Sequence, residues 1–375
     1  MYTTPYARHL RAGDTSDKGK HAMQRREFLK HSAVLAMGMA GAGRLSLASA
    51  QSSGSLAMMT WGGLWGNGMA QYVDAPFAKQ TGYTITQDRG PTPVERVTKL
   101  KINLSNQPYD LVQLHDGVVP LAESQGVLET LDPASPNLPF LKDIPDRFKR
   151  PGWVAMIYSA LGIVYNPKEV KNPPRSYADL WRPEFQGRIV LPEITHSIGP
   201  YVIPIGAMAA GKDPKDEKAG FDMLRKMVKL DPIWAKDTDT IMSSLQTGEA
   251  VVGLLYKSQT YTVREKGGQA EWVFPAEGAI SYLAGTGIAK GTKHKALAEQ
   301  YINMTLNPEY QTWVAKVFNY AGSNPAMLKL LSPEMQQRVQ FSDAEVSRII
   351  DLDQAFISSR RADWTDQWNR VINGA

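Results

Sequence analysis

Short apolar runs recur along the chain, and polar or turn-forming residues bound each of them. Runs of this length between turn signals are typical of buried β-strands. Strands are therefore predicted at residues 55–59, 83–86, 110–114, 188–191 and 250–255.

Amphipathic stretches with helical spacing separate these runs. The spacing is clearest in two sets of apolar residues: Phe221, Leu224 and Val228, and then Leu297, Tyr301 and Met304. The Asn307-Pro308 pair is predicted to end the second of these helices and to begin the next, whose inner face carries Trp313 and Val317. Strands that alternate with helices favour an α/β fold with covered sheets.

The first fifty residues follow a different pattern, in which a basic segment precedes an uncharged one. Arg25 and Arg26 are followed by Phe-Leu-Lys at 28–30, by a small and apolar stretch at 32–43, and by Ala-Ser-Ala at 48–50. This order is typical of a twin-arginine signal peptide. Residues 1–50 are therefore predicted to be a leader that the Tat translocase exports, with Met1 or Met23 as its start.

Removal of this leader changes the charge balance. The whole chain has 42 Lys and Arg against 37 Asp and Glu, but residues 1–50 hold eight bases and three acids, which leaves 34 of each. Without a basic surface the chain is not expected to bind nucleic acid. Cysteine is absent from the sequence, which excludes disulfides, thiolate zinc sites and iron–sulfur clusters. A periplasmic protein is expected.

A series of motifs follows in order between residues 55 and 325. They are TWGGLWG at 60–66, DAPFAKQTG at 74–82, DLVQLHDG at 110–117, GVLETLD at 126–132, LGIVYN at 161–166, SYADLW at 176–181, FQGR at 185–188, GEA at 248–250, FPAEG at 274–278 and LNPEYQ at 306–311. Together they resemble the periplasmic substrate-binding proteins of ABC importers, in the branch that contains the spermidine/putrescine-binding proteins.

The resemblance implies a type II periplasmic-binding-protein fold, in which two α/β lobes are joined by two crossover strands that act as a hinge. Residues 51–155 would form the first lobe, 156–279 the second, and 280–375 the return segment and C-terminal helices. The implied function is that of a monomeric, non-catalytic receptor without a cofactor. It closes on a small molecule and delivers it to an inner-membrane ABC permease.

Candidate ligand-binding residues of the first lobe follow its predicted strands. Trp61 and Trp65 bracket a glycine-rich turn, where the backbone can approach a ligand and the indoles supply apolar walls. Either indole can instead belong to the core. Asp116 follows the third strand, where it accepts hydrogen bonds from a ligand or caps the next helix.

In the second lobe, Glu193 and Ser197 follow a predicted strand and precede a predicted helix. The start of that helix can hold an oxyanion, or Ser197 can simply cap it. Tyr256 and Lys257 follow the strand at 250–255, although solvent exposure is the commoner fate of a lysine. Tyr282 lies where the chain returns to the first lobe.

Two departures from the family pattern bear on the ligand. Polyamine-binding members carry Trp-x-Asp near the return crossover, where this chain has Tyr-Leu-Ala at 282–284, and an element like Trp-Asn-Gly where it has Tyr-Lys-Ser at 256–258. A buried diammonium needs carboxylates, and a nearby lysine repels it. An anionic or amphoteric ligand is therefore predicted rather than spermidine or putrescine. Polyamine binding stays an alternative because Asp116, Glu193 and Glu277 can supply negative charge.

Signatures of metal sites and enzymes are missing from the sequence. It has no Tyr-Tyr pair of the kind that ferric-ion-binding relatives use, and none of the motifs His-Glu-x-x-His, Gly-x-Ser-x-Gly or Gly-Lys-Ser/Thr. No metal and no catalytic residue is therefore expected. An exported cofactor-dependent enzyme with the same two-lobe fold stays the alternative from another functional class.

Overall fold

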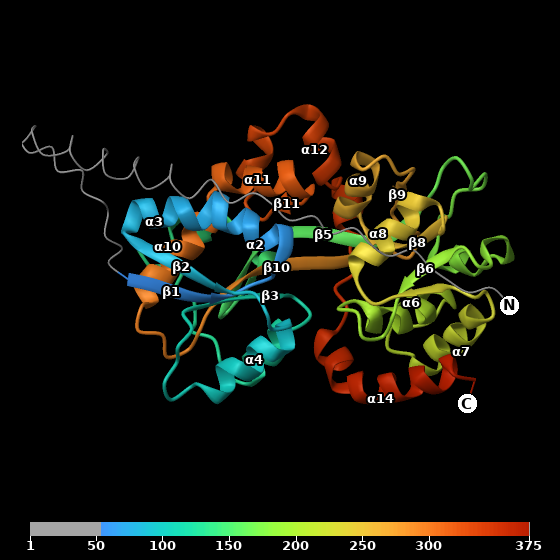
Figure 1. Ribbon diagram of the computed structural model, residues 1–375, viewed down its shortest axis with the longest axis horizontal. Coiled ribbons are helices and arrows are strands. Elements are labelled where there is room, and N and C mark those ends of the chain that lie inside the picture. Colours follow the sequence, from blue (N-terminus) through green and yellow to red (C-terminus); the bar gives the residue numbers. More distant parts are fainter. Residues whose placement is uncertain (1–53, 375) are drawn as a thin grey trace, which may run out of the picture. The chain divides into compact units, whose positions relative to one another are not determined.

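The protein, seen here as a computed structural model, is described over residues 54–374 (Figure 1). The predicted leader at 1–50 lies outside the described residues. The strands are β1 (Gly54–Met59), β2 (Tyr83–Asp88), β3 (Leu111–His115), β4 (Lys149–Arg150), β5 (Trp153–Tyr165), β6 (Ile189–Pro192), β7 (Ile233–Ala235), β8 (Val252–Tyr256), β9 (Glu271–Val273), β10 (Ile280–Ile288) and β11 (Ala321–Gly322). All the strands predicted from the apolar runs are confirmed, with ends that differ by one or two residues.

Helices separate these strands as the amphipathic spacing predicts. The α-helices are α2 (Gly63–Met69), α3 (Ala75–Thr81), α4 (Pro93–Ile102), α5 (Val119–Ser124), α6 (Val202–Ala209), α7 (Glu217–Val228), α8 (Thr238–Thr247), α9 (Lys257–Glu265), α10 (Lys295–Leu306), α11 (Pro308–Phe318), α12 (Pro333–Val339), α13 (Asp343–Val346) and α14 (Gln354–Ile372). A π-helical turn, η1 (Ala70–Asp74), joins α2 to α3. None of the described helices has the length and apolar character needed to cross a membrane.

One mixed sheet runs through the described chain in the order β2-β1-β3-β10-β5-β8-β6-β7. Its two long strands, β5 and β10, pair antiparallel with each other through Trp153–Leu161. Along its other edge β10 pairs with β3 through Ala284–Ile288, and β5 pairs with β8 through Leu161–Tyr165. β5 and β10 therefore cross between a sheet region built on β1–β3 and another built on β6–β8, as Figure 1 shows.

Separate hydrophobic cores lie on the two sides of these crossover strands. One contains Leu56, Met58 and Leu114 from β1 and β3. The other contains Leu191 and Leu254 from β6 and β8. Each sheet region thus has its own core, which is the arrangement that two lobes require. The residue limits predicted for the lobes stay predictions.

The helix boundary at Asn307 is confirmed. Asn307 ends α10, and its side chain accepts a hydrogen bond of 2.9 Å from the backbone amide of Glu309 at the start of α11. The inner face predicted for α11 is only partly right. Trp313 is buried, but Val317 is 45% exposed because it lies in the last turn of the helix, beyond the aromatic rings that cover Trp313.

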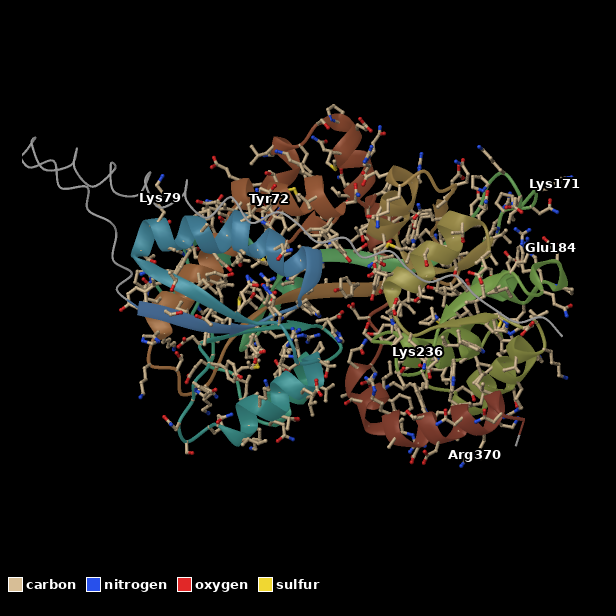
Figure 2. All side chains as sticks on the ribbon, in the orientation of Figure 1. Tyr72, Lys79, Lys171, Glu184, Lys236 and Arg370 are labelled. Atoms are coloured by element: carbon tan, nitrogen blue, oxygen red, sulfur yellow. The ribbon has the colours of Figure 1, made fainter. Side chains whose placement is uncertain are left out.

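The C-terminal helix α14 packs on α7. Arg360 pairs with Glu217 at 2.8 Å, and the indole of Trp364 donates to the same carboxylate at 3.1 Å. The start of α14 also contacts α5 and η6 (Gly199–Tyr201), so the helix reaches elements on both sides of the crossover strands. Charged side chains away from this junction, such as Lys79, Lys171 and Glu184, project outwards in Figure 2.

Candidate functional site

Tyrosines from four separate elements meet beside the crossover strand β10. They are Tyr201 of η6, Tyr256 at the end of β8, Tyr282 of β10 and Tyr320 just before β11, and we call them the tyrosine cluster. The ring centroids of Tyr256 and Tyr282 lie 4.4 Å apart, and those of Tyr282 and Tyr320 lie 6.0 Å apart. Burial raises the pKa of all four phenols, so each hydroxyl is neutral and can donate or accept a hydrogen bond.

Asp116 lies against the tyrosine cluster, and its charge interacts with Tyr201, Tyr256 and Tyr282. Burial raises the pKa of its carboxyl to about 7, and the nearby charge of Asp351 adds to that rise. The Gly117 amide donates to Asp116 Oδ1 at 3.1 Å. Asp116 does not cap α5, whose N-cap is Val118 without a side-chain hydrogen bond. Helix capping therefore does not explain this carboxylate, and ligand binding stays its predicted role.

The charge of Arg96 also acts on the Tyr282 phenol. This arginine of α4 is 1% exposed, and its guanidinium lies 4.6 Å from the ring centroid of Trp61. Its Nη1 group donates to the Gln113 carbonyl at 2.6 Å, and its Nε group to the Pro91 carbonyl at 3.0 Å. Because burial removes water from the charge, the pKa of Arg96 falls to about 10. The side chain is thus a buried cation at the edge of the tyrosine cluster.

The two predicted tryptophans have different surroundings. Trp61 carries Arg96 on its ring and meets Trp65 edge to face, with centroids 6.1 Å apart. Trp65 packs further into the first lobe, 5.6 Å from the ring of Trp313, and its indole donates to Gln113 Oε1 at 2.8 Å. Trp61 therefore lies next to Arg96, and both indoles pack against the first core.

Glu193 and Ser197 lie in the loop after β6. The Glu193 carboxylate accepts from the backbone amide of Thr195 at 3.2 Å, and it also accepts from the Thr195 hydroxyl. Ser197 is exposed and caps neither η6 nor α6. Between them, His196 is 4% exposed, and burial lowers its pKa to about 4, so it is a neutral structural residue bonded to the Ile198 amide at 3.1 Å.

Lys257 begins α9 directly after Tyr256, but its ammonium lies in another contact. Lys257 Nζ donates to the Gln340 carbonyl at 2.6 Å and lies 4.5 Å from the ring centroid of Phe341. The lysine thus joins α9 to the segment after α12. Its predicted role in ligand binding stays a prediction.

Several residues at this junction were not predicted from the sequence, namely Arg96, His115, Tyr201, Tyr320, Gln354 and Arg361. The Tyr201 hydroxyl donates to Gln354 Oε1 at 3.2 Å, and the charge of Arg361 interacts with Tyr201 and His115. Only Arg96 leaves a clear signal in the sequence, because it shares the buried face of α4 with Val97 and Leu100. His115 directly precedes the predicted Asp116, and the other four are brought in from distant segments.

Some polar atoms at the junction lack a hydrogen-bond partner among the described residues. Ser258 Oγ and Gln259 Oε1 are buried near the Tyr320 hydroxyl without a hydrogen bond of normal geometry. A cavity of about 280 Å³ also reaches Asp116, and its charged lining includes Arg147 and Arg150 together with Asp351 and Asp353. Groups of this kind can bind the polar parts of a small molecule. No group of three or more metal-ligating side chains occurs among residues 54–374.

Comparison with known proteins identifies the family. Residues 72–342 match the family described as bacterial extracellular solute-binding protein. The spermidine/putrescine-binding periplasmic protein of Escherichia coli is 27% identical over 283 residues, which cover 72% of this chain and 79% of that protein. The gamma-aminobutyric acid-binding protein of Pseudomonas aeruginosa is 23% identical over 316 residues, 81% of this chain and 87% of that protein. A solved ABC transporter structure from Clostridium perfringens is 27% identical, has a TM-score of 0.69, and covers 84% of this chain and 99% of its own.

These matches confirm the predicted family and the predicted two-lobe α/β fold, and they agree with the predicted periplasmic location. The family and the related structures are solute-binding proteins rather than enzymes. The chain belongs to the bacterial extracellular solute-binding proteins, the family that supplies the substrate-binding components of ABC importers.

Proposed function

We propose that this protein is a periplasmic receptor that closes on a small anionic or amphoteric metabolite and delivers it to an inner-membrane ABC permease. The ligand class is inferred from the charge distribution around the tyrosine cluster. Asp116 is the carboxyl that interacts with these rings, whereas the guanidinium groups of Arg96 and Arg361 both lie close enough to interact with His115.

This distribution suits a ligand with an anionic group. Neither arginine forms an ion pair with a carboxylate within the described chain, and the Arg96 guanidinium donates instead to two neutral backbone carbonyls. A diammonium would bring further positive charge beside them, and the Asp116 carboxyl is only partly ionised near neutral pH because its pKa is about 7. Like charges in a poorly solvated site oppose binding.

Polyamine binding is the second candidate. It is favoured by the name of the Escherichia coli relative and by the half-buried carboxyl of Asp116. The gamma-aminobutyric acid-binding relative of Pseudomonas aeruginosa is the counterexample, because its named ligand carries a carboxylate as well as an ammonium group. Both relatives are similar over most of the chain, so identity alone does not decide between the ligands.

Export and assembly complete the proposal. The Arg25-Arg26 pair directs the precursor to the Tat translocase, and the exported protein acts as a monomer without a cofactor. Hinge motion about β5 and β10 would couple the ligand to the shape that the permease recognises, since a ligand that contacts both lobes favours the closed form.

A thermal-shift screen of the purified protein tests the ligand class. A ligand that binds only the folded chain raises the melting temperature by mass action. Amino acids, aminoalkanoates, aromatic acids and dicarboxylates are compared with spermidine and putrescine. A rise with an anionic or amphoteric compound and none with the polyamines supports the proposal, whereas a rise with the polyamines alone refutes the ligand class. Absorbance in the visible range would favour the enzyme alternative.

A further inference from the structure

A second cavity, of about 260 Å³, lies beside the crossover strands β5 and β10. Its strand residues include Tyr158 of β5 and both Ser281 and Leu283 of β10. Tyr158 and Leu283 are direct partners in the pairing of the two strands. Because neighbouring side chains of a strand point to opposite faces, Leu283 and Tyr282 lie on opposite faces of the sheet. The cavity therefore lies mainly behind the crossover strands, as seen from the tyrosine cluster.

The rim of this cavity is charged and exposed. Arg147 and Asp351 both line the cavity, and the structure leaves both residues exposed. They also line the cavity of about 280 Å³ that reaches Asp116, so the two cavities adjoin. Deeper in the wall, Phe148 is 4% exposed and Ser281 is 7% exposed. A small molecule can therefore enter from solvent and contact both the charged rim and the buried wall.

Aromatic rings hold Arg147 at this rim. Its guanidinium lies 4.4 Å from the ring centroid of Phe148 and 5.6 Å from that of Tyr158. The carboxylate next to it in the sequence, Asp146, pairs with Lys149 at 2.8 Å. A guanidinium that lies over rings keeps its in-plane N–H groups available, and these groups suit the two oxygens of a carboxylate.

Asp351 supplies the opposite charge at the same cavity. Its neighbour Asp353 pairs with Lys215 at 2.6 Å, whereas no ion pair within residues 54–374 involves Asp351. A cavity of about 260 Å³ is smaller than the roughly 300–1,000 Å³ of pockets for drug-sized ligands, so it suits a small metabolite. One cation, one anion and an apolar wall together suit a zwitterion with an apolar side chain. The apolar wall includes Leu283, Val346 and Ile349.

We infer that this cavity is a second ligand site, which binds an apolar α-amino acid behind the crossover strands. The carboxylate of the amino acid contacts Arg147, its ammonium group contacts Asp351, and its side chain lies against the apolar wall. This site is distinct from the tyrosine cluster and does not depend on the ligand proposed there. One wall belongs to β5 and β10, and another belongs to the segment that leads into α14. A bound amino acid therefore favours the arrangement of these elements that preserves its contacts.

Titration calorimetry with L-leucine and two analogues tests the chemistry of this site. 4-Methylpentanoate lacks the ammonium group, 3-methylbutan-1-amine lacks the carboxylate, and both keep the branched side chain. The variants Arg147→Met and Asp351→Asn each remove one charge from the rim. Arg370→Met is the matched control for the first, because Arg370 is exposed on α14 and projects outwards in Figure 2. Tyr256→Ala reports on binding at the tyrosine cluster.

We expect L-leucine to bind the wild-type protein more tightly than either analogue, because each analogue loses one charged contact. Arg147→Met and Asp351→Asn should each weaken L-leucine binding by at least about 10-fold. Arg370→Met and Tyr256→Ala should bind L-leucine like the wild type. Circular dichroism melting of each variant checks that the fold survives. If Arg147→Met does not fold, Asp351→Asn decides the question.

Three results would overturn the inference. They are the absence of L-leucine binding at millimolar concentration, unchanged affinity in a folded Arg147→Met variant, and loss of binding in Tyr256→Ala while both rim variants still bind. The third result would place the amino acid at the tyrosine cluster and so support the amphoteric ligand proposed above. The first two leave the proposed receptor function intact, because that function is tested by the separate screen for a ligand of the tyrosine cluster.

Discussion

Replacement of Asp116 by Asn should stabilise the unliganded protein at alkaline pH. The carboxyl lies beside Tyr201, Tyr256 and Tyr282, and burial raises its pKa from 3.8 to about 7. The folded chain thus holds this proton more tightly than the unfolded chain does. Asn has nearly the same shape but carries no charge, so it avoids the desolvation that the ionised carboxylate suffers above neutral pH.

The size and sign follow from proton linkage. A pKa rise from 3.8 to about 7 corresponds to a ceiling of about 4 kcal/mol, at roughly 1.4 kcal/mol per unit. Asp116 is only half-buried, so we expect about 2 kcal/mol. Because the folded pKa is the higher one, the stability that Asp116 contributes is complete below pH 3.8 and is lost as the pH rises through about 7.

Urea unfolding at pH 5 and pH 8, followed by tryptophan fluorescence, measures this loss. In the wild type, His115 and His196 change stability in the opposite direction. Burial lowers the pKa of each to about 4, so their contribution to the free energy of unfolding grows as the pH rises to the unfolded pKa of 6.5. The unfolding free energy of the wild type relative to that of Asp116→Asn, in which the histidine contributions cancel, should fall by about 1 kcal/mol between the two pH values, because only the part of the pKa shift between pH 5 and about 7 is sampled. Asp366→Asn, on the exposed face of α14, is the control. A difference that is equal at both pH values would refute the reasoning.

The remaining predictions concern the tyrosine cluster, the hinge and export. Tyr256→Ala should weaken ligand binding by about 10- to 100-fold, because it removes a ring 4.4 Å from Tyr282, while Tyr256→Phe should lose much less; calorimetry compares them. Gly285→Ala should lower the free energy of unfolding by about 2–4 kcal/mol in urea titrations, since a Cβ there would lie 2.0 Å from the Val154 carbonyl oxygen. Replacement of Arg25 and Arg26 by Lys should leave the precursor in the cytoplasm; processed protein in the periplasmic fraction would contradict Tat export.

Much of the fold could be predicted from the sequence because its signals are local. The strands β1, β2 and β3 are short apolar runs between turns, and their pattern does not depend on distant partners. The Asn307-Pro308 pair likewise predicts the junction between α10 and α11, because it ends the first helix and caps the second. Val317 was predicted wrongly because its burial depends on which rings cover α11, and helical spacing does not contain that information.

The candidate site was less predictable because it is assembled from distant segments. Tyr256 and Tyr282 follow or form strands, and the family resemblance pointed to both of them. Tyr201 and Tyr320 lie in a 3₁₀ turn and before a two-residue strand, where no periodic pattern marks them. The ligand-binding role of Lys257 stays a prediction, and nothing in the sequence indicates that its ammonium donates to the Gln340 carbonyl, 83 residues further along the chain.

The buried charges connect ligand binding to closure of the lobes. Arg96 and Asp116 are both desolvated at the tyrosine cluster, and desolvation disfavours the charged form of each. It lowers the pKa of the arginine to about 10 and raises the pKa of the aspartate to about 7. Closure without a ligand would therefore bury two unpaired charges, which opposes it. A ligand group of opposite charge that reaches either residue would remove part of this cost. A ligand of this kind would make the closed form depend on its binding, because a ligand shifts a conformational equilibrium by no more than its difference in affinity for the two states.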